Sequence, residues 1–175
     1  MKNVPEQLLQ RNEAYTQHHE ARAPLPTLNT IVISCVDARI DPAHILGLAP
    51  GEAVVLRNAG GRITDAVIQD IALLVAMASR AMQRPARPEI VLIHHTDCGV
   101  ERLRDAAVVQ SLSGASGIEA EHLHAIAIHD HAASLREDFE RLDSSPMVPA
   151  GSRVTALRHD QSSGRAEVVF QKDLT

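Results

Sequence analysis

Residues 30–41 read TIVISCVDARID, an apolar and β-branched run that ends in a thiol and two opposite charges. A continuous run of this kind predicts a strand buried on both faces, which is typical of parallel sheets. We therefore expect a strand over residues 30–34, with Cys35 at its carboxyl end. A buried structural cysteine has no use for Asp37 and Arg39 two and four positions later, so this cluster indicates chemistry.

Two further apolar runs predict strands that also end in polar loops. Residues 53–56 lead into RNAGG at positions 57–61, and residues 89–93 lead into HHTDCG at positions 94–99. The carboxyl ends of neighbouring parallel strands meet at one edge of an open α/β sheet. We therefore expect the three loops to line one pocket.

The rest of the chain predicts helices and a terminal strand pair around this sheet. A polar helix over residues 5–19 and a proline-rich connection make residues 1–27 an N-terminal arm outside the core. The other expected elements are helices over residues 64–82, 100–109 and 123–142, a flexible connection over residues 110–121, and strands over residues 153–159 and 166–170. We predict one domain, residues 1–175, folded as a three-layer α/β sandwich around a mainly parallel sheet.

The composition argues against nucleic-acid and membrane partners. The 175 residues carry a net charge of -5, with a pI near 6.0 and no basic run longer than a pair. No apolar run reaches the ~20 residues needed to cross a bilayer, and the polar N-terminus lacks the apolar segment of a signal peptide. We therefore expect a cytoplasmic protein with two reduced cysteines, whose partners are small molecules or copies of itself.

Cys35, His95 and Cys98 together predict a zinc site. Catalytic zinc takes thiolate and imidazole ligands at three positions and leaves a fourth position open. His95 and Cys98 are three residues apart across a strand-to-helix turn, and Cys35 arrives from another strand end. The alternative is that both cysteines are inert core residues, and it is weakened because both lie in polar loops.

Three ordered motifs resemble those of a known family. CVDAR at positions 35–39, RNAGG at 57–61 and HHTDCG at 94–99 are similar to the patterns of the β-class carbonic anhydrases. The sequence resembles the short bacterial and mycobacterial members in particular. The resemblance covers residues 28–110 and extends loosely to the terminal strand pair.

By this resemblance the cofactor is Zn²⁺, bound by Cys35, His95 and Cys98, and a zinc-bound hydroxide hydrates CO₂ reversibly to bicarbonate. Asp37 and Arg39 are then the catalytic dyad that controls the fourth zinc position. In a closed and inactive state Asp37 itself ligates zinc. In the open state Asp37 pairs with Arg39 and accepts a hydrogen bond from the zinc hydroxide.

The resemblance also implies a substrate pocket and a partner. The loop of Asn58, Ala59, Gly60 and Gly61 is expected to lie beside the substrate, although a left-handed turn without ligand contact is an equal alternative. Members of the family pair through their N-terminal arms. We therefore expect a homodimer or a dimer of dimers in which residues 1–27 clasp a second subunit.

Two other functions fit the same residues. Relatives on this scaffold use the same zinc hydroxide on carbonyl sulfide or carbon disulfide, so hydrolysis of either molecule is an alternative. A non-catalytic zinc-binding protein is the other alternative, if Asp37 closes the site permanently. Arg39 argues against it, because a purely structural carboxylate ligand needs no competing partner.

Several other polar residues are candidates for a site. Four histidines lie close together in the sequence: His122, His124, His129 and His131. Their spacing lacks a carboxylate-anchored metal pattern such as HExxH, which favours a solvated helix face over a second metal site. His94 should point away from His95, as neighbours on a strand do, and Asp97 is expected to accept local amide hydrogen bonds in a turn.

Overall fold

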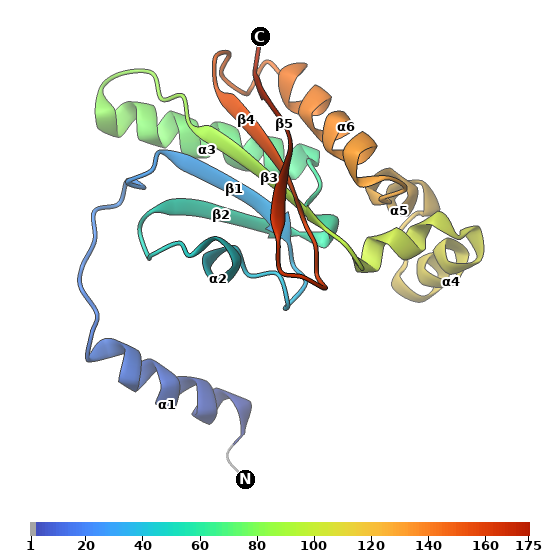
Figure 1. Ribbon diagram of the computed structural model, residues 1–175, viewed down its shortest axis with the longest axis horizontal. Coiled ribbons are helices and arrows are strands. Elements are labelled where there is room, and N and C mark those ends of the chain that lie inside the picture. Colours follow the sequence, from blue (N-terminus) through green and yellow to red (C-terminus); the bar gives the residue numbers. More distant parts are fainter. Residues whose placement is uncertain (1–2) are drawn as a thin grey trace.

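Five strands form one sheet at the centre of the computed structural model, which describes residues 3–175 (Figure 1). They are β1 Thr30–Cys35, β2 Ala53–Asn58, β3 Glu89–His95, β4 Arg153–His159 and β5 Ala166–Asp173. Their order in the sheet is β2-β1-β3-β4-β5. The first four run in parallel, and β5 returns antiparallel to β4 as a terminal hairpin. The predicted mainly parallel α/β sheet is confirmed.

The register of the sheet brings the polar loops to one edge. Cys35 at the end of β1 is the register partner of Asn58 at the end of β2. Ser34 is paired with Ile93 of β3, so His95 extends just beyond the same edge. Because β1 is flanked by β2 and β3 on its two sides, residues 31–35 are buried, as their apolar sequence predicts. The loops after β1, β2 and β3 therefore begin side by side.

Apart from α1, the helices within the described residues 3–175 lie around this sheet (Figure 1). They are α1 Val4–Thr16, α2 Pro42–Leu46, α3 Asp65–Met82, α4 Ala106–Ser116, α5 Ala120–Ile126 and α6 His131–Asp143, with two 3₁₀ segments, η1 Ala59–Gly61 and η2 Gly99–Arg104. Helices α3 and α6 pack on one face of the sheet, where Ile71 and Leu135 join Ile90 and Leu92 of β3 in the main core. A second apolar cluster from η2, α4 and α5 encloses the buried sides of both cysteines. This second cluster covers the edge of the sheet at which the three polar loops begin.

The N-terminal helix stands apart from the rest of the chain (Figure 1). Asn3 caps it, and the Asn3 and Glu6 side chains each bind the other's backbone N–H, which fixes the first turn. No residue of α1 is buried. The helix expected over residues 5–19 is confirmed with bounds Val4–Thr16, and it leads into an extended connection to β1.

Two predictions for the middle of the chain are wrong. Residues 110–121, expected to be a flexible connection, are mostly helical, because Asp105 caps α4 and Val109 is buried beneath it. The single helix expected over residues 123–142 is divided into α5 and α6, since Asp130 caps the N-terminus of α6 with its side chain. Residues 100–104 form the 3₁₀ segment η2 rather than an α-helix.

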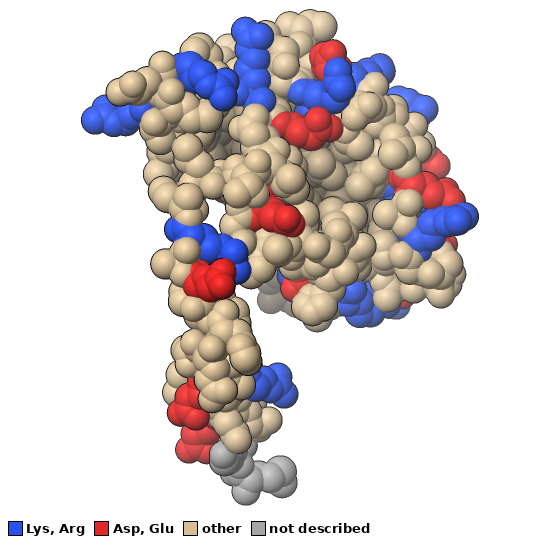
Figure 2. Space-filling view, turned by 60° about the vertical axis from the view of Figure 1, so that its left-hand side comes forward, with Lys and Arg blue, Asp and Glu red and all other residues tan. Residues whose placement is uncertain are grey.

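The surface carries both signs of charge. Figure 2 shows acidic side chains interspersed among the basic ones on the face that it presents, without a continuous basic surface. None of the helices in the described residues is both long enough and apolar enough to cross a bilayer.

Candidate metal centre

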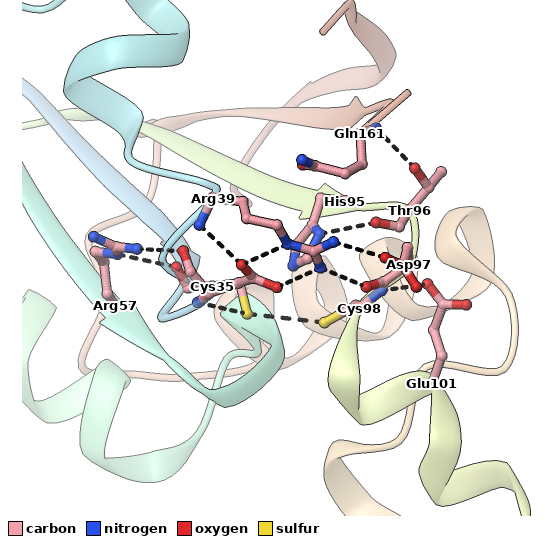
Figure 3. A network of polar contacts seen from close by, with 10 residues as sticks. Cys35, Arg39, Arg57, His95, Thr96, Asp97, Cys98, Glu101 and Gln161 are labelled. Atoms are coloured by element: carbon pink, nitrogen blue, oxygen red, sulfur yellow. Dashed lines mark hydrogen bonds and ion pairs between the residues drawn. The ribbon is translucent and has the colours of Figure 1, made fainter. Parts of the chain in front are cut away.

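Cys35, His95 and Cys98 converge at the carboxyl edge of the sheet. Cys35 ends β1, His95 ends β3, and Cys98 is the N-cap residue of η2. One ligand atom from each of the three lies within 4.8 Å of the others, and this is the only such group found in residues 3–175. Figure 3 shows the two sulfurs facing each other, with the His95 ring and the Arg39 guanidinium beside them. The three residues that the sequence predicts as ligands are thus brought together.

The hydrogen bonds of His95 leave one ring nitrogen free for a metal. Nδ1 lies 3.0 Å from the carbonyl oxygen of Thr96, so Nδ1 carries the proton and donates it. Nε2 is buried and has no hydrogen-bond partner. A buried nitrogen without a partner is costly unless something binds it. Two sulfurs and this nitrogen form the donor set that zinc prefers, so the residues fit the metal.

The two thiols lie in hydrogen-bond contact with each other. Their sulfurs are 3.8 Å apart, and the hydrogen bond with Cys98 lowers the pKa of Cys35 to about 4. Backbone N–H groups of Asp37 and Gly60 lower it further, against the effect of burial. The same thiol contact raises the pKa of Cys98, because a second thiolate would face the first. A divalent cation removes this conflict by binding both sulfurs as thiolates.

Asp37 and Arg39 form a bidentate ion pair beside the three predicted metal ligands. Arg39 donates from Nε to Oδ1 of Asp37 at 3.0 Å and from Nη2 to Oδ2 at 2.7 Å. The backbone N–H of Arg39 adds a third bond at 2.9 Å. These bonds hold the pKa of Asp37 well below its usual range, so the carboxylate stays ionised at any physiological pH.

A second aspartate, which sequence reasoning missed, binds the same guanidinium. Arg39 donates from Nη1 to Oδ2 of Asp97 at 2.7 Å and from Nη2 to the Asp97 carbonyl oxygen at 2.9 Å. Asp97 thus lies in the turn, as predicted, but its carboxylate binds the Arg39 side chain rather than a local backbone amide. The signal for this contact was the expectation that the loops after the first and third strands line one pocket.

Arg57 supports the loop that carries the ion pair. Its Nε donates to the carbonyl oxygen of Cys35 at 3.0 Å, and its Nη2 donates to that of Asp37 at 2.7 Å. Arg57 lies near the end of β2, directly before the predicted pocket loop. The backbone from Cys35 to Asp37 is thereby fixed to β2.

The loop predicted to line the substrate pocket packs directly against Cys35. A Cβ on Gly61 would lie 3.0 Å from the Cys35 nitrogen and 2.9 Å from the Ile93 oxygen, so only glycine fits there. Asn58 closes the loop through both ends of its amide, accepting from Arg62 N at 2.9 Å and donating to Arg62 O at 2.7 Å. Both glycines are buried and Ala59 is exposed. A contact between this loop and substrate stays a prediction.

A buried ionic cluster behind the site was not foreseen from the sequence. Asp138 of α6 accepts from Arg62 Nε at 2.9 and 3.1 Å, from Ile63 N at 3.0 Å and from His94 Nε2 at 3.1 Å. Arg62, His94 and Asp138 are all buried. His94 therefore points away from the metal ligands, as expected, and connects the strand of His95 to the loop that packs on Cys35.

The histidine-rich stretch, which runs from α5 to the first residue of α6, has one member near the site. His131 is half-buried and donates from Nε2 to Oε1 of Glu101 at 3.2 Å. The same Glu101 oxygen accepts from the backbone N–H of Cys98 at 3.0 Å, which fixes the ligand loop. The other three histidines are exposed, in agreement with the predicted solvated face: His122, His124 and His129.

Comparisons with known proteins agree with this geometry. The family model described as carbonic anhydrase matches residues 30–150. Beta-carbonic anhydrase 1 of Mycobacterium tuberculosis is 29% identical over 170 residues, which cover 95% of this chain and 98% of that protein. The carbon disulfide hydrolase of Saccharolobus solfataricus is 35% identical over 71 residues, which cover 41% of this chain and 31% of that protein. The crystal structure of a carbonic anhydrase from Streptococcus mutans has a TM-score of 0.80 and 31% identity, and the match covers 97% of this chain and 99% of that one. The chain belongs to the β-carbonic anhydrase family.

Proposed function

We propose that this protein catalyses the reversible hydration of CO₂ to bicarbonate, with zinc bound by Cys35, His95 and Cys98. The observation that carries the proposal is His95, whose Nε2 is buried without a partner and whose ring offers a ligand atom within 4.8 Å of two sulfurs. Zinc supplies a hydroxide nucleophile at neutral to alkaline pH by lowering the pKa of bound water. The side chains around the proposed zinc site determine how that hydroxide is used.

Asp37 and Arg39 decide whether that nucleophile is available. The Asp37 carboxylate is ionised and can either enter the metal coordination itself or accept a hydrogen bond from the reacting oxygen. Arg39 favours the second role, because its two-pronged bond satisfies both Asp37 oxygens. Arg39 thereby holds Asp37 as an acceptor that orients the nucleophile.

The first prediction concerns pH. We expect CO₂ hydration to rise from neutral to alkaline pH, because water on a zinc held by these residues would be ionised more often, and the hydroxide would compete better with Asp37 for the fourth position. Two thiolates also reduce the charge on the zinc, so its water ionises at higher pH than at a zinc held by neutral imidazoles. Asp37 is fully ionised over this range and contributes no titration of its own.

Stopped-flow hydration assays between pH 6 and 9.5 on zinc-loaded protein test this directly. A rate that is flat across that range would count against the proposal. The same preparation should be assayed with carbonyl sulfide and carbon disulfide, since a curated relative is named as a carbon disulfide hydrolase. Sulfide release with negligible CO₂ hydration would assign the chain to that chemistry, and zinc binding without either activity would assign it a non-catalytic role.

We also propose that the protein is a homodimer in which the N-terminal arm of each subunit packs on the body of the other. Helix α1 has no buried residue, yet it exposes an apolar set of Val4, Leu8, Leu9 and Tyr15. On the body, the second half of α3, the adjoining starts of β1 and β2 and the connection after the arm line a largely apolar cavity of about 520 Å³. An exposed apolar helix and an open apolar cavity on one chain are complementary surfaces for a second copy.

A second prediction tests the contribution of the arm to dimerisation. The double substitution Leu8→Glu and Leu9→Glu should raise the dimer dissociation constant by at least about tenfold, since each buried leucine contributes about 1.5–3 kcal/mol. Sedimentation equilibrium measures this constant. Glu13→Gln on the same helix is the matched control and should leave it unchanged. Equal dissociation constants for the double variant and the control would contradict the exchange.

We further propose a cytoplasmic location. The two sulfurs are 3.8 Å apart and bind a metal only while both are reduced. A reducing compartment such as the cytoplasm maintains that state.

A further inference from the structure

Arg39 is shared between two carboxylates that lie on two different loops (Figure 3). Its bonds to Asp37 are local, because Asp37 is two residues away on the same loop. Its bonds to Asp97 span 58 residues and end on the turn between two of the proposed metal ligands. The guanidinium therefore connects the loop after β1 to the turn after β3.

This second connection fixes the ion pair relative to the metal ligands. A local pair can move as a unit with its own loop, and the Arg39 side chain is long and 44% exposed. Of the hydrogen bonds that the Arg39 guanidinium makes within residues 3–175, those to Asp97 are the ones that leave that loop. The other charged groups acting on Asp97 are Asp37, which repels it, and Arg102, which attracts it from η2.

The backbone of the turn is suited to this contact. Asp97 adopts a left-handed conformation with φ of 57°, which aims both its carboxylate and its carbonyl oxygen at Arg39. Aspartate and asparagine tolerate this conformation better than most residues. The carboxylate is 73% exposed, so neither packing nor burial explains its place in the turn.

We propose that Asp97 is a positioning residue, which anchors Arg39 so that Arg39 keeps Asp37 away from the metal. The inference rests on the proposed roles of Asp37 and Arg39 at a zinc site. Without the Asp97 carboxylate, Arg39 loses the charged anchor on the ligand turn, and its pair with Asp37 is free to move. Asp37 then occupies the fourth metal position for a larger fraction of the time.

The substitution Asp97→Asn tests this with little disturbance, because asparagine keeps the left-handed turn and the carbonyl contact. The decisive readout is the rate of zinc release to a chelator. A fourth protein ligand holds zinc more firmly, so the proposal predicts slower release in Asp97→Asn than in the wild type. An Asp97 that merely stabilises the turn predicts faster release. At neutral pH, kcat/KM should fall by about two- to fivefold, which is the range expected for one exposed ion pair.

Two controls make the result specific. Asp173→Asn removes another largely exposed carboxylate, which pairs with Arg153 at 2.9 Å at the other end of the sheet, and should change neither rate. In the Asp37→Asn background, Asp97→Asn should no longer slow zinc release, because the added ligand is gone. The absorption spectrum of the Co²⁺-substituted protein should report the same change in coordination.

The outcomes separate this inference from the proposed function. Faster or unchanged zinc release in Asp97→Asn, or a slowing that survives in the Asp37→Asn background, overturns the role of Asp97. Slower release that depends on Asp37 supports it, even if the wild type proves inactive toward CO₂. In that case the proposed activity fails while the assigned role of Asp97 stands.

Discussion

Cys98→Ser is expected to abolish CO₂ hydration and to leave a folded chain without zinc. A serine hydroxyl ionises far less readily than a thiol, so the site keeps only two good ligands. The lost rate should be at least about 10³-fold, because the nucleophile depends on the metal. Atomic absorption after dialysis measures the zinc content, stopped-flow measures the rate, and circular dichroism checks the fold.

Ser34→Ala provides the matched control for this substitution. Ser34 is buried next to Cys35, and its hydroxyl has no hydrogen-bond partner, so its removal should cost nothing. The Ser34→Ala protein should therefore retain one zinc per chain and the wild-type rate. A Cys98→Ser protein that still holds one zinc and hydrates CO₂ would remove Cys98 from the ligand set.

The sheet and the ligand cluster were predictable because their signals are local. Strands buried on both faces must be apolar along their whole length, and residues 31–33 and 90–93 show this without interruption. The ligands follow these runs directly. Once the strands are assumed to be parallel neighbours, Cys35 must approach His95 and Cys98.

The contacts that were missed are those between residues far apart in the sequence. The Arg39–Asp97 pair spans 58 residues and the Arg62–Asp138 pair spans 76. The sequence next to an aspartate, in a turn or on a helix, is the same whether or not a distant arginine binds it, so the sequence does not reveal the contact. Helix α4 was missed for a different reason: its serines and glycine resemble a linker, whereas the cap at Asp105 and the burial of Val109 decide its structure.

The cluster of Arg62, His94 and Asp138 gives the largest expected effect on stability. Asp138→Ala removes an acceptor that binds Arg62 at 2.9 Å and His94 at 3.1 Å, and all three residues are buried. The Arg62 charge then stays in the interior without its closest partner. Breaking a buried pair in this way costs about 3–5 kcal/mol, which should be seen in the free energy of unfolding from urea titrations.

Two companion variants show whether charge or packing causes that loss of stability. Glu137→Gln removes only the 63% exposed partner of Arg62 and should cost less than about 1 kcal/mol. The double variant Arg62→Met and Asp138→Leu removes both buried charges, so it should recover much of the loss through apolar packing. If the double variant is as unstable as Asp138→Ala, the cause is the loss of the hydrogen bonds from Ile63 and His94 to Asp138 rather than the unpaired charge.

Whichever cause applies, the loss of stability should be accompanied by weaker zinc binding. His94 and Arg62 connect Asp138 to the strand of His95 and to the loop packed on Cys35.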